Sequence, residues 1–141
     1  GPWLRKAEAR KQAAATFSSF NVQPNRLEAK AGQLSGGNLQ KLVLARELFR
    51  QPSLIVAEQP SQGLDISATE EIWANLLQAR NKAGVLLITG DLNEALTLAD
   101  RIAVIFRGRI MDCFPSSDQD KVNAIGPLMA GIEDHEAHCQ D

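Results

Sequence analysis

Three short apolar runs separated by helical patterns constrain the fold of this chain more than any other feature. The runs occupy residues 54–57, 85–88 and 102–106, and the third predicted strand begins at Arg101. Short apolar runs bounded by turn residues are typical of strands buried on both faces of a sheet. Because helical segments separate the runs, their order favours an α/β fold with parallel strand pairing.

The helices are predicted from periodicity and from the positions of glycine and proline. Residues 3–20 are rich in alanine and lack both breakers, which predicts a helix. A second helix ends before Pro52, because the residue preceding a proline is pushed out of the helical region. Further helices are predicted over residues 67–82, 92–99 and 118–131. Residues 109–114 are expected to form a hairpin with the third apolar run.

Composition excludes several classes of protein. A chain of 141 residues, 44% hydrophobic and 23% charged, can bury the core of a globular domain. A formal net charge of −2 gives no reason to expect a nucleic-acid partner. The apolar runs are far shorter than the ~20 residues that cross a bilayer, and no signal peptide is evident. Two cysteines, Cys113 and Cys139, favour a reducing compartment over a disulfide framework.

A glycine-rich segment precedes the second helix and reads Leu-Ser-Gly-Gly-Asn-Leu-Gln-Lys over residues 34–41. Ser35 suits a helix N-cap, and Gly36 and Gly37 would let the backbone approach a phosphate without a Cβ in the way. The following helix directs free amide groups and its positive dipole end at an anion. Alone, the tetrapeptide over residues 35–38 is an ordinary loop before a helix, and only the downstream motifs favour phosphate binding.

Three motifs in order carry a family resemblance. The segment over residues 34–41, the sequence Leu-Ile-Val-Ala-Glu-Gln-Pro over residues 54–60 and Gly-Leu-Asp over residues 63–65 resemble the signature, Walker B and D-loop of ABC-transporter ATPases. Asn38, residues 41–46 and the ending over residues 125–131 are similar to importers of simple sugars and nucleosides. The resemblance is to the C-terminal part of the second ATPase domain, and it covers residues 31–131.

The resemblance implies a fold class and a division of the chain. We expect a partial P-loop NTPase core with parallel strands and part of the α-helical subdomain. Residues 3–52 would belong to that subdomain, residues 53–131 to the catalytic core and residues 132–141 to a polar tail. Gly1 and Pro2 are interpreted as a scar of protease cleavage. The sequence contains no G-x-x-x-x-G-K-[ST] loop, so the Walker A half is expected to be missing and the chain alone to lack ATPase activity.

The resemblance also implies a set of site residues. In the family, the signature completes the ATP site of a companion ATPase domain, and the cofactors are ATP and Mg²⁺. Asp65, in the D-loop, would couple the two sites across the dimer. The implied nucleotide-binding residues are Ser35, Gly36, Gly37, Asn38 and Gln40.

The site that would contain the chain's own Walker B strand departs from the family pattern. Aligning on Pro60 puts Glu58 at the metal position, where it could hold Mg²⁺ through water, and Gln59 at the catalytic-base position. An amide cannot take the proton of a water molecule. Gly90 stands where the family has its switch histidine. The alternative interpretation is that the Glu58–Gln59 pair merely ends a strand and that Gly90 is a turn before a helix capped by Asp91.

The predicted function is therefore energy coupling in the import of a sugar or nucleoside. The protein would lie peripherally on the cytoplasmic face of the cell membrane, bound to a permease subunit, with a degenerate site of its own. The competing hypothesis is a non-catalytic regulatory or dimerisation module. A soluble ABC protein of DNA repair or translation is disfavoured by Asn38 and by the C-terminal ending. The surface left by the missing half would be apolar, which would allow the chain to self-associate.

Other residues with chemical potential receive plainer interpretations. His135, His138 and Cys139 do not have the spacing of a helical His pair or a Cys-x-x-Cys knuckle, which favours a polar tail. Trp73 is expected in the core of its helix's apolar face. Cys113 is expected to be a partly buried, inert thiol.

Overall fold

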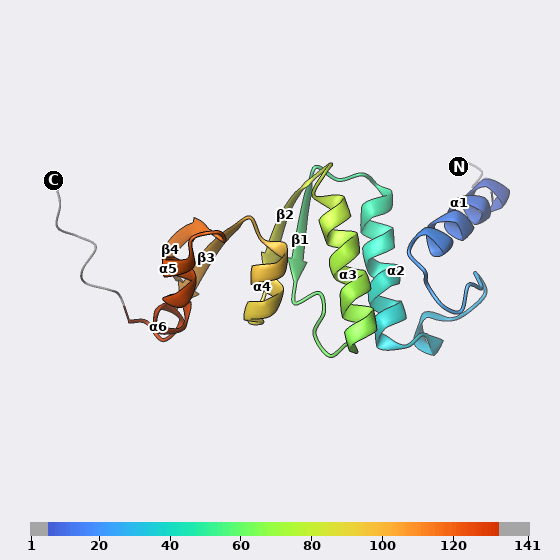
Figure 1. The fold of residues 1–141 in the computed structure, drawn as a ribbon. Helices are drawn as coiled ribbons and strands as arrows, with labels where there is room; N and C mark the ends of the chain where they lie inside the picture. The colour runs from blue at the N-terminus through green and yellow to red at the C-terminus, as the bar shows by residue number, and fades with distance from the viewer. Residues whose placement is uncertain (1–5, 133–141) are drawn as a thin grey trace. The chain divides into compact units, whose positions relative to one another are not determined.

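The computed structural model describes residues 6–132 of the chain. The chain divides between Gly90 and Asp91 into two compact units, and each unit is described by itself. Figure 1 shows the order of the elements along both units. The predicted boundary between the α-helical subdomain and the catalytic core, between residues 52 and 53, stays a prediction. Gly1 and Pro2, interpreted as a scar of protease cleavage, lie outside the described residues, and so does the predicted polar tail beyond residue 132.

The first unit is built around a β–α–β connection. Strands β1 (Leu54–Glu58) and β2 (Gly84–Ile88) pair in parallel, with Leu54 opposite Gly84 and Glu58 opposite Ile88. Helix α3 (Ile66–Ala79) makes the crossover that parallel strands require. The parallel pairing predicted from the sequence is confirmed. The unit also contains α1 (Lys6–Ser19), the 3₁₀ turn η1 (Ala31–Gln33) and α2 (Gly36–Phe49).

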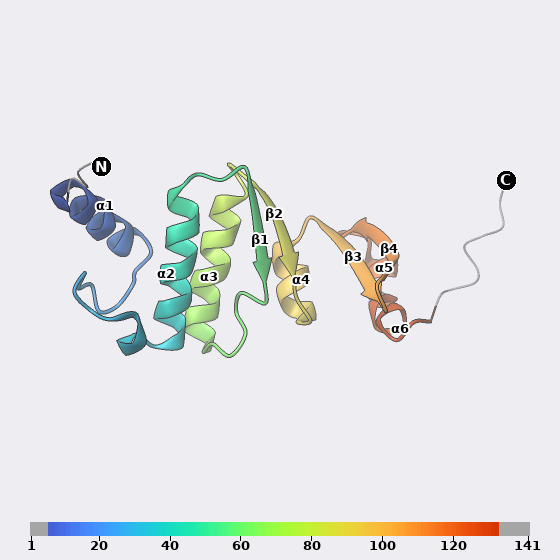
Figure 2. The same ribbon diagram turned by 180° about the vertical axis from the view of Figure 1, so that it is seen from behind.

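Helix α3 is amphipathic and packs beside α2. Ala68, Ile72 and Leu76 recur every four residues and are all buried, as the helical period requires for a face turned to a core. Figures 1 and 2 show α3 lying between α2 and the two strands. Trp73, expected in the core, is half-buried on the same helix. Full burial of one isoleucine such as Ile72 contributes about 1.5–3 kcal/mol.

The expectation that these strands are buried on both faces is wrong for the described residues. Ile55 is 7% exposed, but Val56 beside it is 59% exposed. Leu86 and Ile88 of β2 are 53% and 47% exposed. Successive side chains of a strand point to opposite faces. Within residues 6–90 the helices all lie on one side of the strands (Figures 1 and 2), so the other face stays open.

The second unit contains a β-hairpin covered by two short helices. Helix α4 (Leu92–Leu98) precedes strands β3 (Arg101–Phe106) and β4 (Arg109–Pro115), which pair antiparallel as expected from the sequence. Arg107 and Gly108 form the turn with φ values of 47° and 79°. Two successive positive φ values are those of the tight turn that matches the twist of a hairpin.

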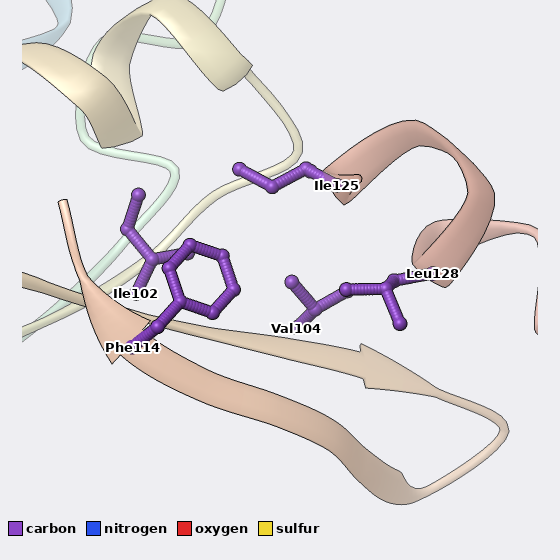
Figure 3. Close-up of a cluster of buried hydrophobic side chains, with 5 residues drawn as sticks. All are labelled: Ile102, Val104, Phe114, Ile125 and Leu128. Atoms are coloured by element: carbon purple, nitrogen blue, oxygen red, sulfur yellow. The ribbon is translucent and has the colours of Figure 1, made fainter. Parts of the chain in front are cut away.

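The core of this unit lies between the hairpin and α6 (Ile125–Met129). Figure 3 shows Ile102 and Val104 of β3 pointing to the same side as Phe114, toward side chains from α6. Cys113 precedes Phe114 on β4 and is exposed, so the expected partial burial is wrong. Neighbouring strand residues face opposite sides, so the burial of Phe114 turns Cys113 to solvent. The core side chains are Ile102, Val104, Phe114, Ile125 and Leu128.

The single helix predicted over residues 118–131 is wrong. The structure has α5 (Gln119–Asn123), capped by Asp118, followed by α6. A continuous helix would require Pro127 to donate to the carbonyl of Asn123, four residues earlier. Proline has no N–H, and its ring clashes with that carbonyl. Pro127 therefore fits only within the first turn of a new helix. No helix among residues 6–132 is long and apolar enough to span a bilayer.

Candidate functional site

The start of α2 is built as the sequence predicted. Ser35 is extended, with φ −63° and ψ 160°, and its Oγ accepts a hydrogen bond from the Asn38 backbone N–H at 3.4 Å. This confirms Ser35 as the N-cap. The Asn38 side chain adds two bonds, donating from Nδ2 to Ser35 Oγ at 2.9 Å and accepting the Gln23 N–H at 2.7 Å. Asn38 therefore ties the segment after α1 to the first turn of α2.

The two glycines of this turn have different surroundings. A Cβ on Gly37 would lie 2.8 Å from the Cβ of Ala68 on α3, closer than real side chains approach. A Cβ on Gly36 would lie 3.9 Å from its nearest neighbour, a methyl group of Leu64. Gly37 is therefore required by the packing of α2 on α3, a role that the sequence analysis missed. Gly36 is exposed and has no such packing requirement.

Two further side chains fasten α2 to the rest of the first unit. Gln40 Nε2 donates to the carbonyl of Pro60 at 2.9 Å, in the loop that follows β1. Lys41 Nζ lies 2.5 Å from Glu71 Oε2 on α3. The sequence analysis assigned Gln40 to nucleotide and gave no role to Lys41 or Glu71. The available signal was a lysine directly before the apolar residues 42–45 of the helix.

Strand β1 ends in an open polar depression of about 440 Å³, lined by Gln40, Glu58, Gln59 and Gln62. Gln59 has a φ of 44°, and its N–H donates to the Ile88 carbonyl at 2.8 Å. The side chains of Glu58 and Gln59 are exposed. The structure thus brings Gln40, from the predicted signature, together with both residues of the predicted Walker B site. Carboxylate and amide groups at this edge can orient water, and Glu58 alone among them carries a charge.

Two further predicted site residues lie beside other elements: Gly90 follows β2, and Asp65 directly precedes α3. A Cβ on Gly90 would have no atom within 4 Å, so this position has room for a larger side chain. Asp65 Oδ1 accepts the Ala68 N–H at 2.8 Å and caps α3. Asp91 Oδ1 accepts the N–H groups of Asn93 and Glu94 at 2.8 and 3.2 Å, which confirms it as the cap of α4.

The described residues contain no group of three or more His, Cys, Asp or Glu side chains that could hold a metal ion. His135, His138 and Cys139 lie outside residues 6–132. Glu58 is the carboxylate at the depression. One carboxylate with neighbouring amides suits a cation that keeps most of its water, as Mg²⁺ does. The residues present therefore fit Mg²⁺ held through water.

Curated relatives match nearly the whole chain but only part of themselves. The glucose import ATP-binding protein TsgD13 of Haloferax volcanii is 42% identical over 134 residues, which is 93% of this chain and 24% of the relative. The guanosine import ATP-binding protein NupO of Bacillus subtilis is 38% identical over 135 residues, 95% of this chain and 26% of the relative. The chain thus spans about a quarter of the length of these relatives. No protein-family model matches it.

Solved structures agree with the sequence relatives. A nucleotide-free ATP-binding cassette from an ABC transporter matches 92% of this chain and 50% of its own, with a TM-score of 0.75 and 24% identity. A dimeric ATP-binding cassette in a post-hydrolysis state, bound to ADP and phosphate, matches 82% of this chain and 50% of its own, with a TM-score of 0.68 and 29% identity. The chain is homologous to part of the ATP-binding proteins of sugar and nucleoside import, and it has the α/β fold of part of an ABC-transporter ATP-binding cassette.

Proposed function

We propose that this chain is part of the ATP-binding subunit of an ABC importer for a sugar or nucleoside. The start of α2 carries the proposal: a capped, exposed helix N-terminus, with Gly36 clear of packing contacts, in a sequence related to import ATP-binding proteins. Such a terminus favours an anion through its free amide groups and dipole. In the proposal, Ser35, Gly36 and Asn38 complete the ATP site of a companion ATPase domain.

The chain's own site is proposed to be degenerate. Glu58 at the end of β1 would hold Mg²⁺ through water, while Gln59 would orient a water without deprotonating it. Gly90 offers no side chain where the family resemblance implies a histidine. ATP with Mg²⁺ would supply the phosphoanhydride whose cleavage powers transport. The residues of this chain would position that group and its water, so turnover would depend on the companion's site.

The proposed partners are a companion ATPase domain and a membrane permease. The dimeric state of a solved cassette similar to this chain supports the first, and the import names of the relatives support the second. We place the protein peripherally at the cytoplasmic face of the cell membrane, with no nucleic-acid partner. Asp65, which caps α3, would lie at the seam between the two ATPase domains.

A Gly36→Asp change in the full-length protein tests the signature assignment. A carboxylate there would repel the phosphates, and Cβ space exists, so the fold should survive. Loss of one anion-binding contact typically lowers kcat by about 10²–10³-fold. Gly126→Asp is the matched control, because a Cβ on Gly126 would have no neighbour within 4 Å and Gly126 lies in the second unit. Parental hydrolysis by the Gly36→Asp protein would refute the assignment.

A non-catalytic regulatory module is the second candidate, favoured by Gln59 and Gly90. Steady-state hydrolysis by the full-length protein, with and without Gln59→Glu and Gly90→His, separates the two. Hydrolysis that neither change raises supports a degenerate site beside a competent one. Hydrolysis raised severalfold by Gln59→Glu indicates a site that lacks only its base. No hydrolysis in any form supports the non-catalytic module.

A further inference from the structure

An ion pair with a buried lysine joins α2 to α3 outside the polar depression. Lys41 is 6% exposed, and its ammonium lies against Glu71 on α3, whose side chain is 34% exposed. Glu71 Oε2 also accepts a hydrogen bond from Asn21 Nδ2 at 3.4 Å, from the segment after α1. Taking a lysine out of water costs free energy that an ion partner repays only in part. Stability alone therefore explains this pair poorly, whereas fixing a particular arrangement of two helices explains it well.

The ion pair lies one turn beyond the two helix starts. Gly37 in the first turn of α2 leaves no room for a Cβ beside Ala68 in the first turn of α3, and Lys41 and Glu71 meet in the next turns. The two helices are thus joined at two successive levels, and Figures 1 and 2 show them lying side by side. Because the two helices are fixed to each other in two successive turns, neither can slide or rotate against the other.

We propose that Lys41 and Glu71 are positioning residues that hold the start of α2 in register with the start of α3. The inference rests on the proposed function, which assigns Ser35 to the companion's ATP and Asp65 to the dimer seam. The ion pair makes Ser35 and Asp65, the caps of α2 and α3, move as one body. When the two ATPase domains close at the dimer seam, the start of α2 is therefore placed together with Asp65. Neither member of the pair lines the depression.

A Lys41→Met/Glu71→Met double variant of the full-length protein tests this role. Replacing both charges by apolar side chains of similar length leaves no unpaired charge, so the protein should fold. We expect kcat to fall roughly tenfold, because small misplacements of a binding group slow turnover. The KM for ATP should stay within about twofold, because the companion's own phosphate loop holds the nucleotide. The exchanged pair, Lys41→Glu/Glu71→Lys, should recover most of the lost kcat.

The matched control is Arg46→Met/Gln78→Met, which alters exposed residues on the same two helices. It should turn over ATP at the parental rate. A parental kcat in the Lys41→Met/Glu71→Met protein would overturn the proposal. So would a rise in KM as large as the fall in kcat, or an exchanged pair that folds without recovery.

Hydrogen exchange gives a readout that needs no nucleotide. The N–H groups of Asn38 and Leu39 bond to Ser35, and those of Ala68 and Thr69 bond to Asp65. In the doubly substituted protein these four amides should exchange roughly tenfold faster, while the later turns of both helices keep their protection. Unchanged exchange overturns the positioning role. If the unaltered protein hydrolyses no ATP, the hydrolytic importer assignment fails, and the exchange result still decides the role of the pair.

Discussion

Adjacent residues with the same identity serve different purposes in this chain. Gly36 and Gly37 both lie in the first turn of α2, and a sequence argument assigns both to a phosphate. The structure shows that a Cβ would be tolerated at Gly36 but would collide with Ala68 at Gly37. Substitutions at Gly37 therefore disturb helix packing as well as any ligand, which makes Gly36 the cleaner position for testing nucleotide contacts.

Gly37→Ala should lower the free energy of unfolding by about 1–3 kcal/mol, the usual cost of an overpacked contact. Gly36→Ala is the matched control and should be neutral or slightly stabilising, because alanine favours helix more than glycine does. Adding Ala68→Gly to Gly37→Ala removes the colliding atom and should recover part of the loss. Urea unfolding of the four proteins measures these differences. Equal stability of the two single variants would contradict the packing role.

At the scale of elements, an ion pair joins β4 to the following helix. Lys121 Nζ donates to Asp112 Oδ2 at 2.7 Å, with the two side chains 43% and 27% exposed. This hydrogen bond, helped by the Cys113 N–H and the lysine charge and opposed by partial burial, lowers the pKa of Asp112 below its ordinary value of 3.8. A carboxyl whose pKa is lower in the folded state stabilises the fold when it is ionised.

The contribution of this pair should therefore be complete above pH 3.8 and should fade as the pH falls below it, through the lowered pKa. Lys121→Met should cost about 0.2–1 kcal/mol at neutral pH, the range for a solvent-accessible pair. The cost should shrink in acid. Unfolding of both proteins at neutral pH and well below pH 3.8 measures it, with Lys82→Met, an exposed lysine, as control. A cost that is independent of pH would contradict the assignment.

Another element-scale prediction concerns the end of α6. Gly131 has a φ of +80°, and a Cβ there would overlap the ring of Phe106 at the end of β3. Gly131→Ala should lower the free energy of unfolding of the second unit by about 2 kcal/mol, through backbone strain and overpacking. Gly126→Ala, whose Cβ meets nothing within 4 Å, is the control and should cost nothing. Equal effects of the two changes would contradict this account.

The order of helices and strands could be predicted from local sequence patterns, whereas contacts between distant residues could not. Ser35 and Asp91 were found as caps because each stands directly before a helical pattern. Pro127 carried enough information to divide the last helix, and that signal was overlooked. The Lys41–Glu71 pair joins residues thirty positions apart, which no periodicity reveals. For the site, the sequence identified Glu58 and Gln59, but only the fold places Gln40 beside them.

At the scale of the whole molecule, one apolar surface stands out. The open face of the first unit's sheet consists of Leu54, Val56, Leu86 and Ile88, each at least 47% exposed. Contiguous apolar surface of this kind is covered in most soluble proteins. The hairpin of the second unit shows a smaller apolar pair, Ile105 and Ile110, which face each other across the strands. Because the sheet face is the larger of the two apolar patches, we expect it to drive self-association of the chain.

We expect the isolated chain to self-associate through the sheet face. Val56 and Leu86 are cross-strand partners at its centre, so Val56→Lys/Leu86→Glu should disrupt the patch while keeping opposite charges adjacent. Burial of apolar surface stabilises an interface by about 25 cal/mol per Å². Because the two charged side chains remove part of this apolar surface, the association constant should fall at least roughly tenfold. Sedimentation across a concentration series measures it. Ile105→Lys/Ile110→Glu is the matched control, and a larger effect from that pair would place association on the hairpin.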